Sequence, residues 1–158
     1  MAKWLIIGLF LGGFSASADQ ELFPTKPDPD VTVGDYCDEQ DPDFVGYRYE
    51  DKVPYCIRKV SRHRKTRVYN QYHVPEDCRV EYTVDHYIPL FMGGSNEVAN
   101  LWPEHRRVKA TRQNLEQQLY LELRNGHITQ SRAIEVVTEA KMNPPQVAPS
   151  ECHLKATH

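Results

Sequence analysis

The sequence has no apolar run long enough to span a membrane, no closely spaced pair of cysteines and no internal repeat. Its main apolar stretch, residues 4–14, is much shorter than the roughly 20 residues that a membrane-spanning helix needs. None of the four cysteines stands in the C-x-x-C spacing of structural zinc sites, which disfavours a zinc-binding domain. The lack of a repeat excludes a repeat architecture.

Residues 1–18 have the pattern of a secretory signal peptide. Lys3 places a positive charge before the apolar stretch, and residues 16–18 are the small residues Ala, Ser and Ala. We therefore expect cleavage after Ala18 and a secreted or periplasmic protein without membrane association, with a retained anchor helix as the alternative. The remaining chain of about 140 residues suffices for one domain with a modest core.

The four cysteines all follow the expected cleavage point, so they would meet an oxidising compartment where disulfides form. Three pairings are possible for four cysteines. We favour Cys37 with Cys56, which would link the N-terminal region to the domain, and Cys78 with Cys152, which would link the tail. Free buried thiols are the alternative.

Charge is divided unevenly along the chain, although the net charge is only −3. Residues 19–57 hold eleven acidic residues against three basic ones, whereas residues 58–158 hold fifteen basic against eleven acidic. Residues 58–70 alone carry six Lys or Arg and no acid. Such a stretch suits contact with a polyanion, because Lys and Arg bind phosphates, and a solvated helix face is the alternative. The small excess does not predict tight, salt-resistant binding.

We predict an α+β fold with a single domain. After the leader, residues 19–45 form an irregular acidic arm with prolines and no periodicity, and residues 46–158 form the domain. Strands are expected at residues 80–84 and 100–102, with a strand or loop near residues 47–57. We expect a long helix at about residues 104–124, with Pro103 in its first turn, Leu115, Leu119 and Leu123 in the core and Gly126 at its end. Thr129 would cap a second helix through about residue 140.

The most informative local pattern begins at Asp85 and His86, which follow the strand expected at residues 80–84. A turn at Gly93 and Gly94 comes next, and Asn100 leads into Leu101, Trp102 and Pro103. A carboxylate such as Asp85 can hold a hard divalent cation. A neutral imidazole, with an ordinary pKa near 6.5, can take a proton from water. Together these groups would suit hydrolysis of a phosphodiester.

This segment resembles the ββα-metal (HNH-type) nuclease motif. It is most similar to small secreted bacterial HNH-like endonucleases, whose core reads D-H-x-x-P-L-x-x-G-G-S-N and then N-L-W-P. The resemblance covers about twenty residues, with weaker likeness upstream to Arg58 and downstream to Glu116. It implies a ββα-metal core at residues 80–124 and a metal-dependent endonuclease acting on DNA, with RNA as the alternative. Mg²⁺ is the expected ion and Mn²⁺ the second choice. No base-reading module is visible, which favours low sequence specificity.

The resemblance also implies roles for single residues. Asp85 would ligate the metal, and His86 would be the general base. Asn100 would bind the loop back onto the strand that carries the base, which is an orienting role. A basic residue near the scissile phosphate would be Arg58, with Arg62 as the second choice.

The chain departs from the family pattern at Lys109. Many HNH-type sites have a His or Asn at this position to complete the metal shell, and a charged lysine cannot ligate. On the same face of the expected helix lie His105, Gln113 and Glu116, whereas Asn114 faces away. We favour Glu116 and then His105 as the remaining ligand.

Lys109 keeps a second hypothesis open, namely an exported nucleic-acid-binding or uptake protein with an inactive nuclease site. A third, a disulfide-linked structural or inhibitor domain, would leave Asp85 and His86 unexplained.

Overall fold

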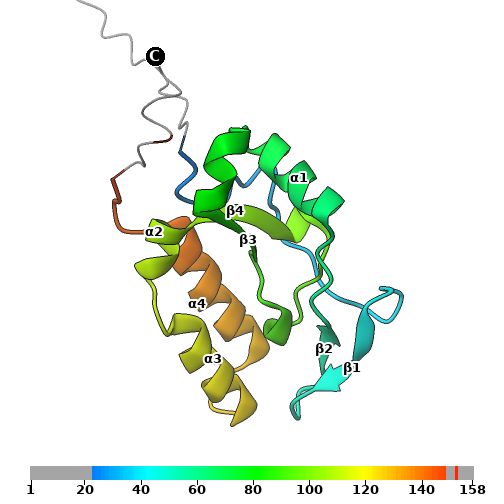
Figure 1. Ribbon diagram of the computed structural model, residues 1–158. Coiled ribbons are helices and arrows are strands. Elements are labelled where there is room, and N and C mark those ends of the chain that lie inside the picture. Colours follow the sequence, from blue (N-terminus) through cyan, green and yellow to red (C-terminus); the bar gives the residue numbers. More distant parts are fainter. Residues whose placement is uncertain (1–22, 149–151, 153–158) are drawn as a thin grey trace, which may run out of the picture.

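The structure is a computed structural model that describes residues 23–148 and Cys152 (Figure 1). The described residues have a mixed α+β architecture with two small antiparallel sheets, of which the β1–β2 sheet lies at the edge of the molecule (Figure 1). The expected leader, with its cleavage point after Ala18, lies outside the described residues. Within residues 23–148, no helix has both the length and the apolar character needed to cross a membrane.

Each sheet has two strands. In the first, β1 (Phe44–Arg48) pairs with β2 (Val53–Cys56), and in the second, β3 (Tyr82–His86) pairs with β4 (Leu101–His105). The α-helices are α1 (Arg62–Gln71), α2 (Arg106–Ala110), α3 (Leu115–Arg124) and α4 (Gln130–Met142). Three short 3₁₀ helices are η1 (Glu76–Glu81), η2 (Leu90–Met92) and η3 (Val98–Asn100).

The helix ends follow from local side chains. Ser61 Oγ accepts a hydrogen bond from Arg64 N at 3.2 Å at the start of α1. Thr129 Oγ1 does the same for Arg132 N at 3.3 Å, as predicted for the cap of α4. Gly126 follows α3 with a φ of +68°, a left-handed conformation that glycine adopts without steric cost.

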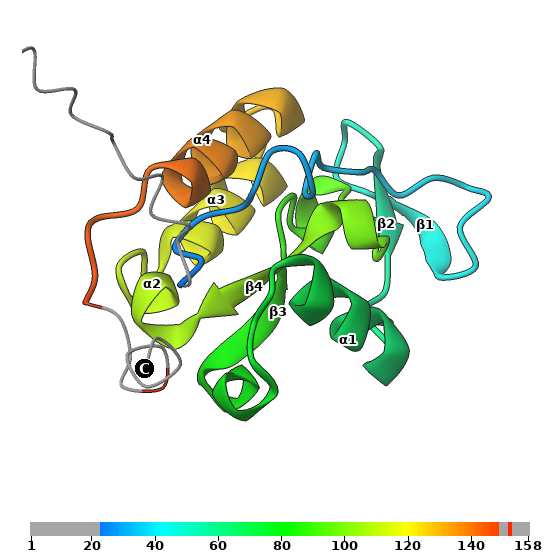
Figure 2. The ribbon, with the colours of Figure 1, turned by 90° about the horizontal axis from the view of Figure 1, so that it is seen from above.

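The β3–β4 hairpin lies between α1 on one side and the α3–α4 pair on the other (Figure 2). One core cluster packs α3 and α4 against the segment after β3 and contains Ile88, Met92, Leu119, Leu123 and Val137. Below α1, a second cluster is formed by the buried residues Val68, Val84, Val98 and Leu101. The predicted leucine stripe is thus core, and each buried aliphatic side chain contributes roughly 1.5 to 3 kcal/mol.

From Phe23, where the described residues begin, to β1 the arm has no helix or strand, yet it is bound to the domain. Thr32 Oγ1 donates to Leu101 O at 2.9 Å, and Gly34 N donates to Ala99 O at 2.9 Å. Cys37 N donates to Gly93 O at 2.9 Å, so the arm crosses the loop that precedes β4. These hydrogen bonds hold the arm against the loop that precedes β4.

Two disulfides join Cys37 to Cys56 and Cys78 to Cys152, which confirms the favoured pairing. The first links the arm to the end of β2, and the second links η1 to the C-terminal tail. Disulfides of this kind indicate an extracellular or otherwise oxidising compartment.

The single long helix predicted for about residues 104–124 is wrong. The strand β4 continues to His105, and a turn region between α2 and α3 contains Asn114 with a φ of +70°. Pro103 lies in β4 opposite Val84, not in a first helical turn. Pairing with β3 buries Glu104 and His105, which overrides the helical pattern.

Two strand boundaries also differ from the prediction. Val80 lies in η1 with 71% of its surface exposed, so β3 begins at Tyr82 and includes Asp85 and His86 as its last residues. Asn100 ends η3 and precedes β4. The predicted strand or loop near residues 47–57 is the β1–β2 hairpin.

Gly94 offers a test of how tightly the loop between β3 and β4 is packed. A Cβ at Gly94 would overlap the backbone carbonyl of Ile88. We expect Gly94→Ala to lower the free energy of unfolding by at least about 3 kcal/mol, since the backbone has to move. Gly126→Ala is the control: its Cβ meets no atom within 4 Å, and the left-handed φ should cost about 1 kcal/mol. Chemical denaturation measures both variants, and equal decreases in their free energies of unfolding would contradict the close approach at Gly94.

Candidate functional site

Asn100 holds the loop between β3 and β4 in place. Its Nδ2 donates to Ile88 O at 3.0 Å and to Ser95 O at 2.9 Å, and its Oδ1 accepts from Ile88 N at 2.9 Å. The side chain is fully buried. These are the contacts expected of an orienting residue, because they fix the loop to the chain that follows His86.

An open pocket of about 250 Å³ brings together four of the six predicted site residues, namely Arg58, Asp85, His86 and Glu116. Arg48 and Tyr55 from the β1–β2 hairpin line the same pocket, with the Arg48 guanidinium carbon 3.2 Å from the Tyr55 ring centre. The pocket therefore contains an imidazole, two carboxylates and two guanidinium groups.

The hydrogen bonds of His86 define which ring nitrogen carries the proton. Nε2 lies 3.0 Å from Asn96 Oδ1, and Nδ1 lies 3.2 Å from Arg58 Nη1. A guanidinium can only donate, and an amide oxygen can only accept. These partners assign the proton to Nε2 and leave the lone pair of Nδ1 directed toward Arg58. Arg58 is held in turn by a bond from Nη2 to Val84 O at 2.8 Å.

Asn96 is a residue that sequence reasoning missed as part of the site. Its Nδ2 donates to Asp43 Oδ2 and to Ile57 O, which fixes the amide so that Oδ1 faces His86. Asn96 and Asp43 are both buried. The position of Asn96 within the motif was visible in the sequence, but its partner Asp43 belongs to the arm.

The environment of His86 keeps its imidazole neutral. Burial is the main reason that the pKa of His86 falls from 6.5 to about 4. The hydrogen bond to Asn96 and the charge of Asp85 oppose this decrease in pKa, whereas the positive charges of Arg58 and Lys141 add to it. At neutral pH the ring is therefore a proton acceptor, as the general-base hypothesis requires.

Two lysines neutralise Asp85. Lys109 Nζ lies 3.1 Å from Asp85 Oδ1, and Lys141 Nζ lies 3.3 Å from Asp85 Oδ2. Burial by itself would raise the pKa of Asp85, but the ammonium groups of Lys141 and Lys109 hold it well below its usual range. The carboxylates of Asp85 and Glu104 likewise raise the pKa of Lys109 against the effect of burial.

Lys141 was not predicted as a site residue. Its side chain is 0% exposed, and its ammonium group reaches His86 O at 2.6 Å and Glu116 Oε1 at 3.0 Å in addition to Asp85. Its three N–H donors thus match three acceptors. The signal was present in the sequence, because Ala133, Val137 and Lys141 recur every four residues on the buried face of α4.

The two candidate ligands beside Asp85 have different positions. Glu116, in the first turn of α3, lines the pocket and shares Lys141 with Asp85. The structure does not bring His105 to this group: it is paired with Tyr82, at the other end of the hairpin. His105 Nε2 lies 3.0 Å from Glu81 Oε2, and Nδ1 accepts from Arg107 N at 3.1 Å.

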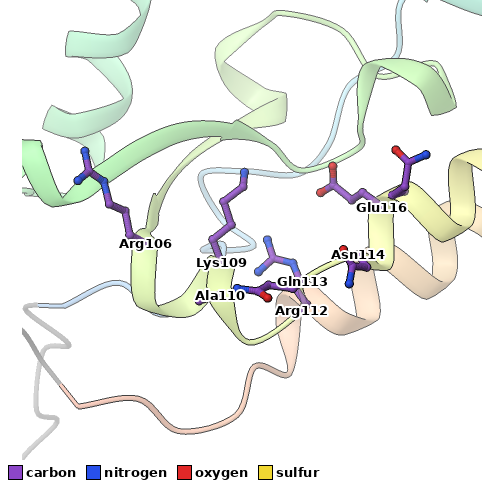
Figure 3. A pocket seen from close by; sticks show the side chains of 8 residues that line it. Arg106, Lys109, Ala110, Arg112, Gln113, Asn114 and Glu116 are labelled. Atoms are coloured by element: carbon purple, nitrogen blue, oxygen red, sulfur yellow. The ribbon is translucent and has the colours of Figure 1, made fainter.

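A second pocket of about 460 Å³ adjoins the first and shares Glu116 with it. In Figure 3, Lys109 from α2 and Glu116 from α3 project to the same side, and Arg106 lies at the start of α2, farther from Glu116. Arg112 pairs with the fully buried Glu104, which also lies 3.1 Å from Lys109 Nζ. Burial and the nearby Asp85 raise the pKa of Glu104.

The donor set at Asp85 does not fit the expected Mg²⁺ or Mn²⁺. Both Asp85 oxygens already face ammonium groups, and Glu116 contributes an oxygen to one of them. The carboxylates of the cluster are matched by an equal number of cations: Asp85, Glu104 and Glu116 face Lys109, Arg112 and Lys141. Without a net negative charge, the cluster has little to attract a divalent ion. The metal site remains a prediction that this geometry does not support.

Two other groups of potential ligand atoms occur among the described residues. One contains Cys37 and Cys56, and the other contains Cys78 and Cys152. All four sulfur atoms are used in disulfides, and only a thiolate binds metal strongly. Neither group therefore supports a metal centre.

No protein-family model, curated protein or solved structure matches this chain. The geometry of the pocket therefore carries the functional argument.

The lowered pKa of His86 predicts a pH-dependent stability. Above pH 6.5 both folded and unfolded chains hold His86 neutral, whereas between pH 6.5 and about 4 only the unfolded chain takes up the proton. The free energy of unfolding should therefore fall by about 3 kcal/mol as the pH drops through this window, and the contribution should not change further below it. The measurement is chemical denaturation of the wild type and of His86→Gln in chelator at several pH values. The difference between their free energies of unfolding should become smaller by that amount as the pH falls from 6.5 to about 4. A constant difference would contradict the buried neutral imidazole.

Proposed function

We propose that this protein is an exported endonuclease that hydrolyses phosphodiester bonds of DNA, with RNA as the alternative substrate and little sequence preference. The observation that carries the proposal is one open pocket in which the lone pair of His86 Nδ1 faces the guanidinium of Arg58. A base and a phosphate-binding cation thus lie within reach of the same substrate atom.

The reaction uses His86 as the general base. When a phosphate enters, the guanidinium of Arg58 turns from Nδ1 to the anionic oxygens, which frees Nδ1 for a water molecule. That water gives its proton to Nδ1 as its oxygen forms a bond to phosphorus, and one P–O ester bond breaks. The departing oxygen takes a proton from solvent. The bond from Nε2 to Asn96 keeps the ring in the productive tautomer throughout.

Substrate binding in this proposal relies on cations of α1 and α2. On α1, Arg62, Lys65 and Arg67 are exposed, whereas Arg64 pairs with Glu97 at 2.7 Å. On α2, Arg106 and Lys109 line the second pocket. Contacts of this kind bind the backbone of a nucleic acid irrespective of its sequence, which supports low specificity.

One observation favours a second candidate function, an exported nucleic-acid-binding protein without turnover. Lys109 occupies the expected ligand position and lies 3.1 Å from Asp85, so a metal-dependent reaction would be blocked there. Cleavage separates the two functions, because the binding protein would retain plasmid DNA without nicking it.

Plasmid nicking by the purified protein tests the proposal. We expect His86→Gln to lower the nicking rate by about 10² to 10⁴ while DNA binding persists, because a general base contributes that much to rate. His127→Gln is the matched control, since this histidine is exposed beyond the end of α3. Equal nicking by wild type and His86→Gln would remove His86 from the mechanism.

The basic face of α1 should act on substrate capture. Replacing Arg62, Lys65 and Arg67 together by Gln should raise KM and lower the log–log salt slope by about 1 for each phosphate that a removed cation had bound. The saturated rate should stay within about tenfold of wild type. Arg58→Gln should instead lower the saturated rate, and Arg124→Gln with Arg132→Gln should change neither quantity. An unaltered salt slope in the triple variant would mean that this face is only solvated.

A further inference from the structure

The geometry points to a site in which a lysine takes the place of a metal ion. The ammonium group of Lys141 lies between Asp85 and Glu116, where a divalent ion would bind, and cleavage by the protein requires no divalent ion. The catalytic part of this inference rests on the proposed function. The binding part does not, because it concerns only whether Asp85 and Glu116 can hold a metal.

The contacts of Lys141 support this assignment. Its Nζ lies 3.3 Å from Asp85 Oδ2, 3.0 Å from Glu116 Oε1 and 2.6 Å from His86 O. Two of these partners are the carboxylates that were expected to ligate a metal, and the third is the carbonyl of the general base itself. With 0% of its surface exposed, the ammonium group keeps no contact with water.

A divalent ion would have to displace this group at a high cost. Lys141 lies on the same buried face of α4 as Ala133 and Val137, and its side chain is 0% exposed. Moving the ion in would leave a buried ammonium group without its acceptors. Binding of a divalent ion and the native position of Lys141 therefore exclude one another.

Lys109 supplies the cation that a substrate can reach. Its side chain is 49% exposed, and it contacts Asp85 on the side opposite Lys141. Together with Arg58 it can neutralise a phosphate. Lys141 meanwhile balances the negative charges of Asp85 and Glu116 and donates a hydrogen bond to the carbonyl of His86. In this arrangement Lys141 is a positioning residue, since it does not touch the substrate.

The decisive measurement is the binding of Mn²⁺ to protein from which metals have been removed. For the wild type we expect calorimetry to show no saturable site and the melting temperature to be unchanged by Mn²⁺. For Lys141→Met we expect one site that binds at least tenfold more tightly than any site of the wild type, with a lowered melting temperature that Mn²⁺ restores. Adding Asp85→Asn to Lys141→Met should abolish that site, and Lys26→Met, at an exposed lysine of the arm, should behave as wild type.

A saturable Mn²⁺ site in the wild type that Asp85→Asn removes would overturn the inference. A folded Lys141→Met variant that gains no site would do the same. If Lys141→Met does not fold in chelator, Lys141→Gln takes its place, because its amide can still donate to the carbonyl of His86. Restored folding or a restored melting temperature of either variant in Mn²⁺ would support the inference.

Nicking in chelator tests the catalytic part. We expect the wild type to cleave plasmid equally well in EDTA and in Mg²⁺, within about twofold. Cleavage that requires Mg²⁺ would overturn the inference and leave the proposed endonuclease in place. Absence of nicking in every condition would refute the proposed function instead, and Mn²⁺ binding would still decide whether Lys141 occupies the cation position.

Discussion

The ion pairs of Lys141 are the interaction on which the arrangement of this site depends. One ammonium group joins the end of β3, through Asp85 and the carbonyl of His86, to α3 through Glu116 and to α4 through its own side chain. β3 is distant in sequence from α3 and α4, which follow one another along the chain. A buried charge cluster contributes little to stability compared with an apolar replacement, but removal of one member is costly, about 3 to 5 kcal/mol. The cluster thus selects one packing of α4 against the hairpin.

A second constraint places the imidazole within that frame. Asn100 holds the loop after His86, and Asn96 on the same loop holds the ring, so both amides have to be correct for Nδ1 to face the pocket. The loop can pass so close to Ile88 because Gly94 has no side chain. Backbone sterics, amide hydrogen bonds and imidazole orientation are therefore linked in one short segment.

The parts of the site that the sequence predicts are those that are local. Asp85 and His86 are adjacent, Asn100 follows at motif spacing, and four predicted residues do meet in one pocket. Of the three possible cysteine pairings, the one favoured from the sequence is the one that the structure contains. What could not be predicted depends on contacts between distant segments. Asn96 and Asp43 are 53 residues apart, and Asp43 lies in an arm without periodicity. The four-residue spacing from Ala133 and Val137 places Lys141 on the buried face of α4, but a lysine at a helix end is ordinarily solvated. Its burial is explained only by its partners Asp85 and Glu116, which come from distant segments. The break between α2 and α3 contains no glycine or proline that would have predicted it, and Asn114 there has a φ of +70°.

The bond between Cys37 and Cys56 closes a loop of chain that includes Asp43, the residue that anchors Asn96 and thereby the imidazole. Before this bond forms, the unfolded chain has more freedom to lose on folding, by roughly 3 kcal/mol for a loop of this length. In a reducing compartment, where this bond does not form, the same polypeptide would hold the imidazole of His86 less firmly. Under the proposed function, oxidation would therefore act as a maturation step, because the site would be held in its final form only in an oxidising compartment.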